Sequence, residues 1–141
     1  GGIQMSIKDF AEKLIKAYDE ALVKGNTKPL KALEDPNVVY HMGIRGDIVG
    51  SDAHEQDILG ARMALSDIKM ELKYLTGEGN LLALSYKARY ISSGKVPGFP
   101  PAGKEITNNS LFLFHLKNGK IKEVWMNGYT TGLDETAYLK K

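Results

Sequence analysis

A change in hydrophobic periodicity near Ile68 divides this sequence into a helical first half and a strand-forming second half. Apolar residues between Ile7 and Leu22 recur every three or four positions, as they do on one face of a helix. After Ile68, apolar and polar residues alternate, as in strands that have one solvated face. Helices that precede strands in this way are typical of an α+β domain rather than of an alternating α/β fold.

Three helices are expected in the first half of the chain. The first begins after Ser6, which suits an N-cap, and ends at Gly25, which suits a C-terminal cap. The second helix is expected at 29–34, with Thr27 as its N-terminal cap. The third is expected at 52–65, with Ser51 as its cap. Between them, two short strands are expected at 38–42 and 48–49.

The second half predicts an antiparallel meander. Its strands are expected from Ile68 to a turn at 77–80, and then at 81–91, 106–116 and 121–129. The segment 92–103 is rich in Gly and Pro and is expected to be a loop. Asn118-Gly119 between two apolar runs is the strongest hairpin signal in the chain. A long twisted sheet packed against helices can curl into a cone, and the open end of a cone is a natural pocket for a small molecule.

Length and composition favour one ordinary globular domain over residues 1–141, in which 1–4 look like vector or leader residues. The net charge of +2 is too small to favour nucleic-acid or membrane binding. The absence of cysteine excludes disulfides and thiolate chemistry. No apolar stretch reaches the roughly 18 residues of a membrane span, so we expect a cytoplasmic protein without a membrane partner.

The histidines do not form a recognisable metal site. His54-Glu55 begins a metalloprotease-like motif, but Ile58 stands where its second histidine belongs. His54 lies on a polar helical stretch and is expected to be solvated, whereas His115 is expected to face away from the pocket or toward a partner. No metal and no other cofactor is expected.

The last strand carries the most informative side chains. Trp125, Asn127 and Tyr129 share one face with Glu123, and Val124 lies on the other. This face fits either the wall of a pocket or a plain hydrophobic core. Tyr86 and Tyr90 share a face of the long strand, with the same two interpretations.

His41 lies in a short apolar strand and is a candidate general base near neutral pH. A structural, hydrogen-bonded histidine is the alternative interpretation of the same position.

Several segments together resemble the SnoaL-like polyketide cyclase branch of the nuclear-transport-factor-two-like (ketosteroid-isomerase-like) superfamily, over nearly the whole chain. They are Tyr40-His41, Ser66-Asp67-Ile68, Gly77-Glu78-Gly79-Asn80, the segment from Phe99 to Lys104, and Asn118 to Trp125 followed by Gly132-Leu133.

The resemblance implies a cone-shaped, curved antiparallel sheet wrapped around three N-terminal helices, a homodimer, and a ligand inside the cone. Cyclases of this family carry an acidic residue four positions after the tryptophan, where this chain has Tyr129. Tyrosine is a poor base at neutral pH, but it can donate a hydrogen bond to an enolate oxygen.

Three functions are compatible with these features. The first is a cofactor-free lyase or isomerase that cyclises or isomerises a small hydrophobic carbonyl compound through an enolate. Its candidate catalytic residues are His41, Asn127 and Tyr129, and its candidate ligand-binding residues are Trp125, Tyr18, Tyr40, Tyr86, Tyr90 and Phe99. The second is a binding domain without catalysis, and the third is a dimerising module whose aromatic residues fill the cone.

A homodimer is expected in each case, through the outer face of the sheet. If Phe112 and Phe114 point inward, Leu111, Leu113 and His115 lie on this outer face.

Overall fold

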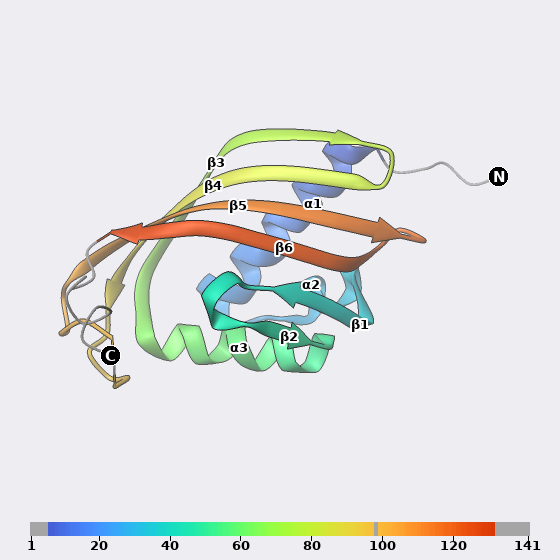
Figure 1. Cartoon of the computed structure of the whole chain (residues 1–141). Helices are drawn as coiled ribbons and strands as arrows, with labels where there is room; N and C mark the ends of the chain where they lie inside the picture. Colours follow the sequence, from blue (N-terminus) through green and yellow to red (C-terminus); the bar gives the residue numbers. More distant parts are fainter. Residues whose placement is uncertain (1–5, 98, 132–141) are drawn as a thin grey trace.

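The computed structural model describes residues 6–97 and 99–131, which contain three α-helices and six strands (Figure 1). The helices are α1 (Ile7–Asp19), α2 (Lys28–Leu33) and α3 (Ser51–Ala64). The strands are β1 (Glu34–His41), β2 (Asp47–Val49), β3 (Leu65–Glu78), β4 (Leu81–Ser92), β5 (Glu105–Lys117) and β6 (Lys120–Thr131). This order confirms the α+β class and the meander that the periodicity predicts.

The strands of the described residues form one sheet in the order β2-β1-β6-β5-β4-β3. Neighbouring strands are antiparallel except for β1 and β6, which run parallel, so the sheet is mixed rather than purely antiparallel as expected. The parallel pair is possible because a long stretch of chain separates the two strands, whereas a tight turn can join antiparallel neighbours only. Asn118 and Gly119 form such a turn between β5 and β6, with φ values of 53° and 74°.

The sheet is curved, and it does not close into a barrel. The pairing of β3 with β4 shifts register twice, between Ser66 and Lys69 and between Leu72 and Tyr74. Such bulges bend a strand and increase its local twist. In Figure 1, β3 and β4 bend from the upper edge of the sheet down toward α3, while α1 crosses behind the long strands. The concave face of the sheet is therefore covered by helices.

A row of side chains across four strands defines the inner face of the sheet. Tyr40, Val124, Phe114 and Leu82 are successive register partners in β1, β6, β5 and β4, and each is at most 1% exposed. One position along, the row of His41, Trp125 and Leu113 points to the outer face. This parity confirms that Phe112 and Phe114 point inward and that Leu111, Leu113 and His115 point outward.

Helix α1 begins as the sequence predicts, because the Ser6 side chain accepts a hydrogen bond of 3.1 Å from the Asp9 backbone amide. It continues into a π-helical turn, Glu20–Lys24, and ends at Gly25 with a φ of 75°. The caps predicted for the other two helices are partly wrong. Gly50, with a φ of 94°, precedes α3, so Ser51 is its first residue rather than its cap. Thr27 does precede α2, but its hydroxyl donates to the Glu55 carboxylate of α3 instead of capping the helix.

Candidate functional site

A cavity of about 60 Å³ lies between α1 and the concave face of β3, β4 and β5. By a measure in which one water occupies about 10–15 Å³, this volume accommodates several water-sized groups. Its walls are mostly aliphatic and aromatic, and the lining residues are Leu14, Ile15, Tyr18, Met70, Glu71, Leu72, Leu84, Tyr86, Phe112 and Phe114. Such a lining, with few polar groups, is typical of sites for small apolar molecules.

Two tyrosines of this lining, Tyr18 from α1 and Tyr86 from β4, keep neutral hydroxyls. Burial raises the pKa of Tyr18 far above its ordinary value, against a smaller lowering effect of the Tyr40 hydroxyl. Burial also raises the pKa of Tyr86 to about 12, against a smaller lowering effect of the Ser110 hydroxyl. A phenol with such a raised pKa keeps its proton at neutral pH and can take part in hydrogen bonds without carrying charge. Both residues line the cavity, and their predicted role in ligand binding stays a prediction.

Glu71 on the edge strand β3 is the one acidic residue among the lining residues, but its side chain is 66% exposed. Its pKa is lowered, chiefly by the hydrogen bond from the Lys73 ammonium at 2.9 Å. A carboxylate stabilised in this way is a weaker proton acceptor than a free one. Glu71 is therefore poorly suited to serve as the base of the cavity.

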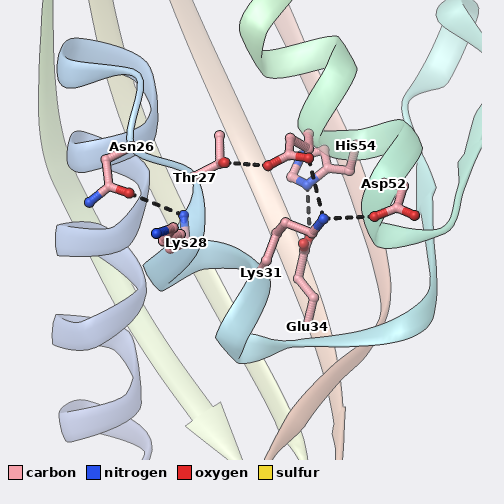
Figure 2. A network of polar contacts seen from close by, with 8 residues as sticks. Asn26, Thr27, Lys28, Lys31, Glu34, Asp52 and His54 are labelled. Atoms are coloured by element: carbon pink, nitrogen blue, oxygen red, sulfur yellow. Dashed lines mark hydrogen bonds and ion pairs between the residues drawn. The ribbon is translucent and has the colours of Figure 1, made fainter.

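A polar cluster of Glu34, Tyr40 and His54 is buried next to the Tyr18 side of the cavity. Glu34 Oε2 accepts a hydrogen bond from the Tyr40 hydroxyl. It also accepts one from His54 Nδ1 at 2.6 Å (Figure 2). The rings of Tyr40 and His54 stack with centroids 3.8 Å apart, and the Tyr18 ring meets His54 edge-on at 6.3 Å. The side chains of Glu34 and His54 are only 1% and 5% exposed. The expectation that His54 is solvated is therefore wrong.

The sequence contains a signal for each member of this cluster. His54 precedes the buried Ile58 by four residues, so the two share a helix face. Glu34 and Tyr40 are six residues apart in β1 and share its inner face with Val38. The signal at Glu34 was hidden because the expected second helix included it, whereas α2 ends at Leu33.

Ion pairs between α2 and α3 lie beside this cluster (Figure 2). Lys31 Nζ lies 2.7 Å from Asp52 Oδ1 and 3.2 Å from Glu55 Oε1, and Thr27 also donates to Glu55. These contacts join the start of α3 to α2 and to the residue just before it. They therefore help to fix Glu34 and His54 relative to each other, since Glu34 directly follows α2 and His54 lies in the first turn of α3.

The candidates from the last strand lie on the outer face of the sheet. Trp125, Asn127 and Tyr129 point away from the core, and Trp125 and Tyr129 are 37% and 66% exposed. None of them lines the cavity between α1 and β3, β4 and β5. The roles predicted for Asn127 and Tyr129 in catalysis and for Trp125 in ligand binding stay predictions.

His41 also lies on the outer face, where its ring stacks on Trp125 with centroids 5.4 Å apart. Its two nitrogens contact Glu123 Oε2 at 2.6 Å and Asp47 Oδ1 at 2.9 Å. These hydrogen bonds, with that of Glu123 the stronger cause, raise the pKa of His41. They favour the protonated ring, which lacks the lone pair that a base needs. The predicted role of His41 as a base stays a prediction without support from this geometry.

The remaining candidates are dispersed. Tyr40 is fully buried and belongs to the polar cluster, whereas Tyr90 is half-buried in β4 beyond Tyr86. Phe99 is 45% exposed in the loop between β4 and β5 and does not line the cavity. Of the nine predicted site residues, the structure thus brings Tyr18, Tyr40 and Tyr86 together around the cavity and its buried cluster.

In 6–97 and 99–131, no group of three or more His, Asp or Glu side chains is arranged to hold a metal ion. The helices of the same residues include none long and apolar enough to cross a membrane.

Solved structures with the same fold include proteins named as cyclases and isomerases. A candidate SnoaL-like polyketide cyclase from Jannaschia sp. CCS1 has a TM-score of 0.76 at 17% identity, covering 99% of this chain and 95% of its own. IdmH, a candidate polyketide cyclase from Streptomyces antibioticus, has a TM-score of 0.72 at 21% identity, covering 97% and 100%. A candidate isomerase from Rhodopseudomonas palustris has a TM-score of 0.74 at 16% identity, covering 93% and 97%. These likenesses establish the fold.

No curated protein sequence matches the chain significantly. The family model described as SnoaL-like polyketide cyclase matches residues 12–128, from within α1 to within β6. The chain therefore belongs to the SnoaL-like polyketide cyclase family.

Proposed function

We propose that this protein binds a small, largely apolar carbonyl compound in the cavity between α1 and β3, β4 and β5, and promotes its cyclisation or isomerisation through an enolate. The observation that carries the proposal is the cavity itself, an apolar space whose wall includes two tyrosines with raised pKa values. Membership of the SnoaL-like family supports the same class of reaction.

The chemistry suits an enolate because the cavity lining is neutral apart from Glu71. An enolate forms when a base removes a proton next to a carbonyl group, and negative charge then develops on the carbonyl oxygen. A hydrogen-bond donor in a water-poor site stabilises that charge more strongly than a donor in water does. A tyrosine hydroxyl that stays protonated is such a donor. No metal or organic cofactor takes part in the proposed reaction.

The proposed reaction can be tested without knowledge of the natural substrate. Cyclohexanone is a small, apolar and enolisable ketone, and its α-protons exchange with deuterium whenever an enolate forms. The purified protein in D₂O at neutral pH should accelerate the loss of the α-proton NMR signal. Saturation of that rate with ketone concentration would indicate a binding site rather than a general surface effect.

A variant that fills the cavity provides the control for location. Leu72→Trp introduces a large ring at a cavity position of β3 that is already 39% exposed, so the fold should tolerate it. Tyr74→Trp is the matched control, since Tyr74 is 78% exposed on the same strand and does not line the cavity. The Leu72→Trp variant should lose exchange and ketone binding, and Tyr74→Trp should keep both. Equal rates in the two variants would place any activity elsewhere.

The second candidate is a binding protein without catalysis. It is favoured by the absence of a suitable base among the lining residues, because Glu71 is held in its ionised form by Lys73. Saturable binding of the ketone, lost in Leu72→Trp, with no exchange above the rate in buffer would select this function.

A further inference from the structure

We propose that the side-chain amide of Asn108, oriented by Ser110, donates the hydrogen bond that binds the carbonyl oxygen of the ligand. The inference rests on the proposed function for the ligand class, a small apolar carbonyl compound, but not on the enolate step. It places the polar end of the site in the middle of β5. It also makes a hydrogen-bond acceptor a required feature of the ligand.

Asn108 lies on the concave face of the sheet, in the same cross-strand row as part of the cavity lining. Met70 of β3 lines the cavity and pairs in register with Ala88 of β4, which pairs in turn with Asn108 of β5. Neighbouring strands are about 4.8 Å apart, so Asn108 lies roughly 10 Å across the sheet from Met70. Between them the row contributes no side chain larger than the methyl group of Ala88. A ligand that extends along this row beyond the cavity of about 60 Å³ therefore reaches Asn108.

The Ser110 hydroxyl orients the Asn108 amide. Ser110 is 3% exposed, and its Oγ donates a hydrogen bond of 2.7 Å to Asn108 Oδ1. Alternate residues of a strand are about 6.8 Å apart, so this contact requires the Asn108 side chain to lean along β5 toward Ser110. Ser110 pairs in register with Tyr86, which lines the cavity. The amide of Asn108 therefore leans toward the cavity along β5.

The contact with Ser110 leaves the amide nitrogen of Asn108 available as a donor. An asparagine amide has one acceptor oxygen and two N–H donors, and the hydroxyl proton of Ser110 occupies the oxygen. Within the described ranges 6–97 and 99–131, Asn108 Nδ2 has no hydrogen-bond partner. Asn108 is half-buried, so a ligand on the concave face can still reach this nitrogen.

Two residues in this part of the sheet depart from ordinary strand preferences. Asparagine is depleted in strands, yet Asn108 lies within β5, an interior strand of the sheet. Gly128 of β6 is the register partner of Ser110, and a Cβ at this position would lie 2.8 Å from Ser110 Oγ. Glycine within a strand often marks a place where another group approaches closely. Departures of this kind from local preference are expected at functional sites.

An uncharged amide donor suits the proposed ligand class. Its desolvation costs less than that of a Lys or Arg side chain, so it fits beside a largely apolar cavity. The apolar body of the ligand would occupy the cavity, and its carbonyl oxygen would accept a hydrogen bond from Nδ2. If an enolate forms, negative charge develops on that oxygen and the same hydrogen bond becomes stronger. The amide itself transfers no proton.

The first test observes the hydrogen bond directly. The ¹³C NMR signal of cyclohexanone labelled at its carbonyl carbon moves upfield when the oxygen loses a hydrogen bond. The signal of the ketone bound to Asn108→Ala should therefore lie upfield of that in the parent chain, and Kd should rise about fivefold, as for the loss of one hydrogen bond. An unchanged signal and Kd in a folded Asn108→Ala would overturn the inference.

Asn109→Ala is the matched control for this variant. Asn109 is the adjacent residue of the same type, and it faces the outer side of the sheet opposite Tyr129. Its truncation should leave the carbonyl signal, Kd and exchange rate at their parental values. An effect as large as that of Asn108→Ala would show that the change is not specific to the concave face, and the inference would be wrong.

The second test measures deuterium exchange of the same ketone. Loss of one donor to a developing oxyanion lowers a rate by about 100-fold, and we expect a decrease of this size in Asn108→Ala. Ser110→Ala should give a smaller decrease, because the amide remains but is no longer held in one orientation. If Ser110 acts only through Asn108, Ser110→Ala should change neither the carbonyl signal nor the exchange rate in an Asn108→Ala background. Independent, additive losses would overturn its positioning role.

These measurements separate the inference from the proposed function. If the parent chain binds the ketone without exchange and Asn108→Ala moves the carbonyl signal, the enolate function is wrong and the Asn108 site stands. If Leu72→Trp abolishes binding and exchange but Asn108→Ala changes neither, the proposed function stands and the Asn108 site is wrong. If the parent chain does not bind the ketone, both are wrong.

Discussion

His41 Nε2 lies 2.6 Å from Glu123 Oε2, while Nδ1 of the same ring lies 2.9 Å from Asp47 Oδ1. The imidazolium form carries a proton on each nitrogen, so it satisfies both carboxylates at once, whereas the neutral ring can donate to one only. This arrangement connects β1 to β2 on one side and to β6 on the other. The histidine predicted as a base is thus a bridge across three strands of the outer face.

We predict that Glu123→Gln lowers the pKa of His41 more than Asp47→Asn does, because the Glu123 hydrogen bond is the larger cause of its rise. NMR titration of the His41 ring protons measures both effects. Glu105→Gln is the control, since Glu105 pairs with Arg89 away from this site. Equal midpoints in the parent chain and Glu123→Gln would show that the contact does not persist in solution.

The same contact predicts the sign of a pH effect on stability. A histidine whose pKa rises on folding stabilises the folded state below its unfolded pKa, which is near 6.5. That contribution disappears as pH rises through the higher folded pKa. The free energy of unfolding of the parent chain should therefore fall more between acidic and mildly alkaline pH than that of His41→Gln. Urea unfolding at a series of pH values tests this, and parallel curves would contradict it.

Phe114 and Leu113 are adjacent in β5 and test the assignment of the two sheet faces. Phe114 is 1% exposed and Leu113 is 36% exposed. Phe114→Ala should lower the free energy of unfolding by about 3–5 kcal/mol, because it leaves a cavity in the core. Leu113→Ala should cost less than about 1 kcal/mol. Urea unfolding measures both values. Similar decreases in the free energy of unfolding for the two variants would mean that β5 does not have one buried and one exposed face.

The order of elements could be predicted from the sequence because it depends on local patterns. Alternation in β5 and β6 and the Asn118-Gly119 turn are encoded within short segments, and the structure agrees with both. The parallel pairing of β1 with β6 depends on contacts between distant segments, which periodicity does not encode. The prediction that Trp125, Asn127 and Tyr129 share one face of the last strand was correct. Alternation alone, however, does not tell whether that face is the concave or the convex side of the sheet.

The candidate site was predicted only in part for the same reason. Tyr18 and Tyr86 were identified as aromatic residues on apolar faces, and both line the cavity. Glu34 was missed because its position at the junction of α2 and β1 decides which face it occupies. The expected helix ended one residue too late, and the expected strand began at Val38, whereas β1 begins at Glu34. His54 was predicted to be solvated because its neighbours in the sequence are polar, although its four-residue spacing from Ile58 places it on the buried face of the helix.

Two glycines allow a paired test of backbone geometry. Gly119 has a φ of 74° in the β5–β6 turn, where an alanine costs about 1–2 kcal/mol. Gly60 lies within α3, is not among the positive-φ glycines, and has no atom within 4 Å of an added Cβ. Gly119→Ala should therefore lower the melting temperature and Gly60→Ala should raise it, since alanine favours a helix by about 1 kcal/mol over glycine. Thermal unfolding by circular dichroism measures both shifts, and a stabilised Gly119→Ala would contradict the turn geometry.

The outer face of β5 and β6 is proposed to pair with a second copy of the chain. Leu113 and Trp125 are register partners that are 36% and 37% exposed, and the neighbouring Leu111 is 63% exposed. Contiguous apolar groups of this kind on a sheet face are typical of interaction surfaces. The double variant Leu111→Lys and Leu113→Lys should sediment as a monomer. The free-energy cost of burying two ammonium groups exceeds the contribution of the apolar contact that they replace. Val49→Lys is the control, because Val49 on the edge strand β2 is 66% exposed, close to Leu111 at 63%, and this variant should leave the dimer intact. A parent chain that sediments as a monomer at all concentrations would show that this face stays uncovered, and Trp125 would then be free to contact another molecule.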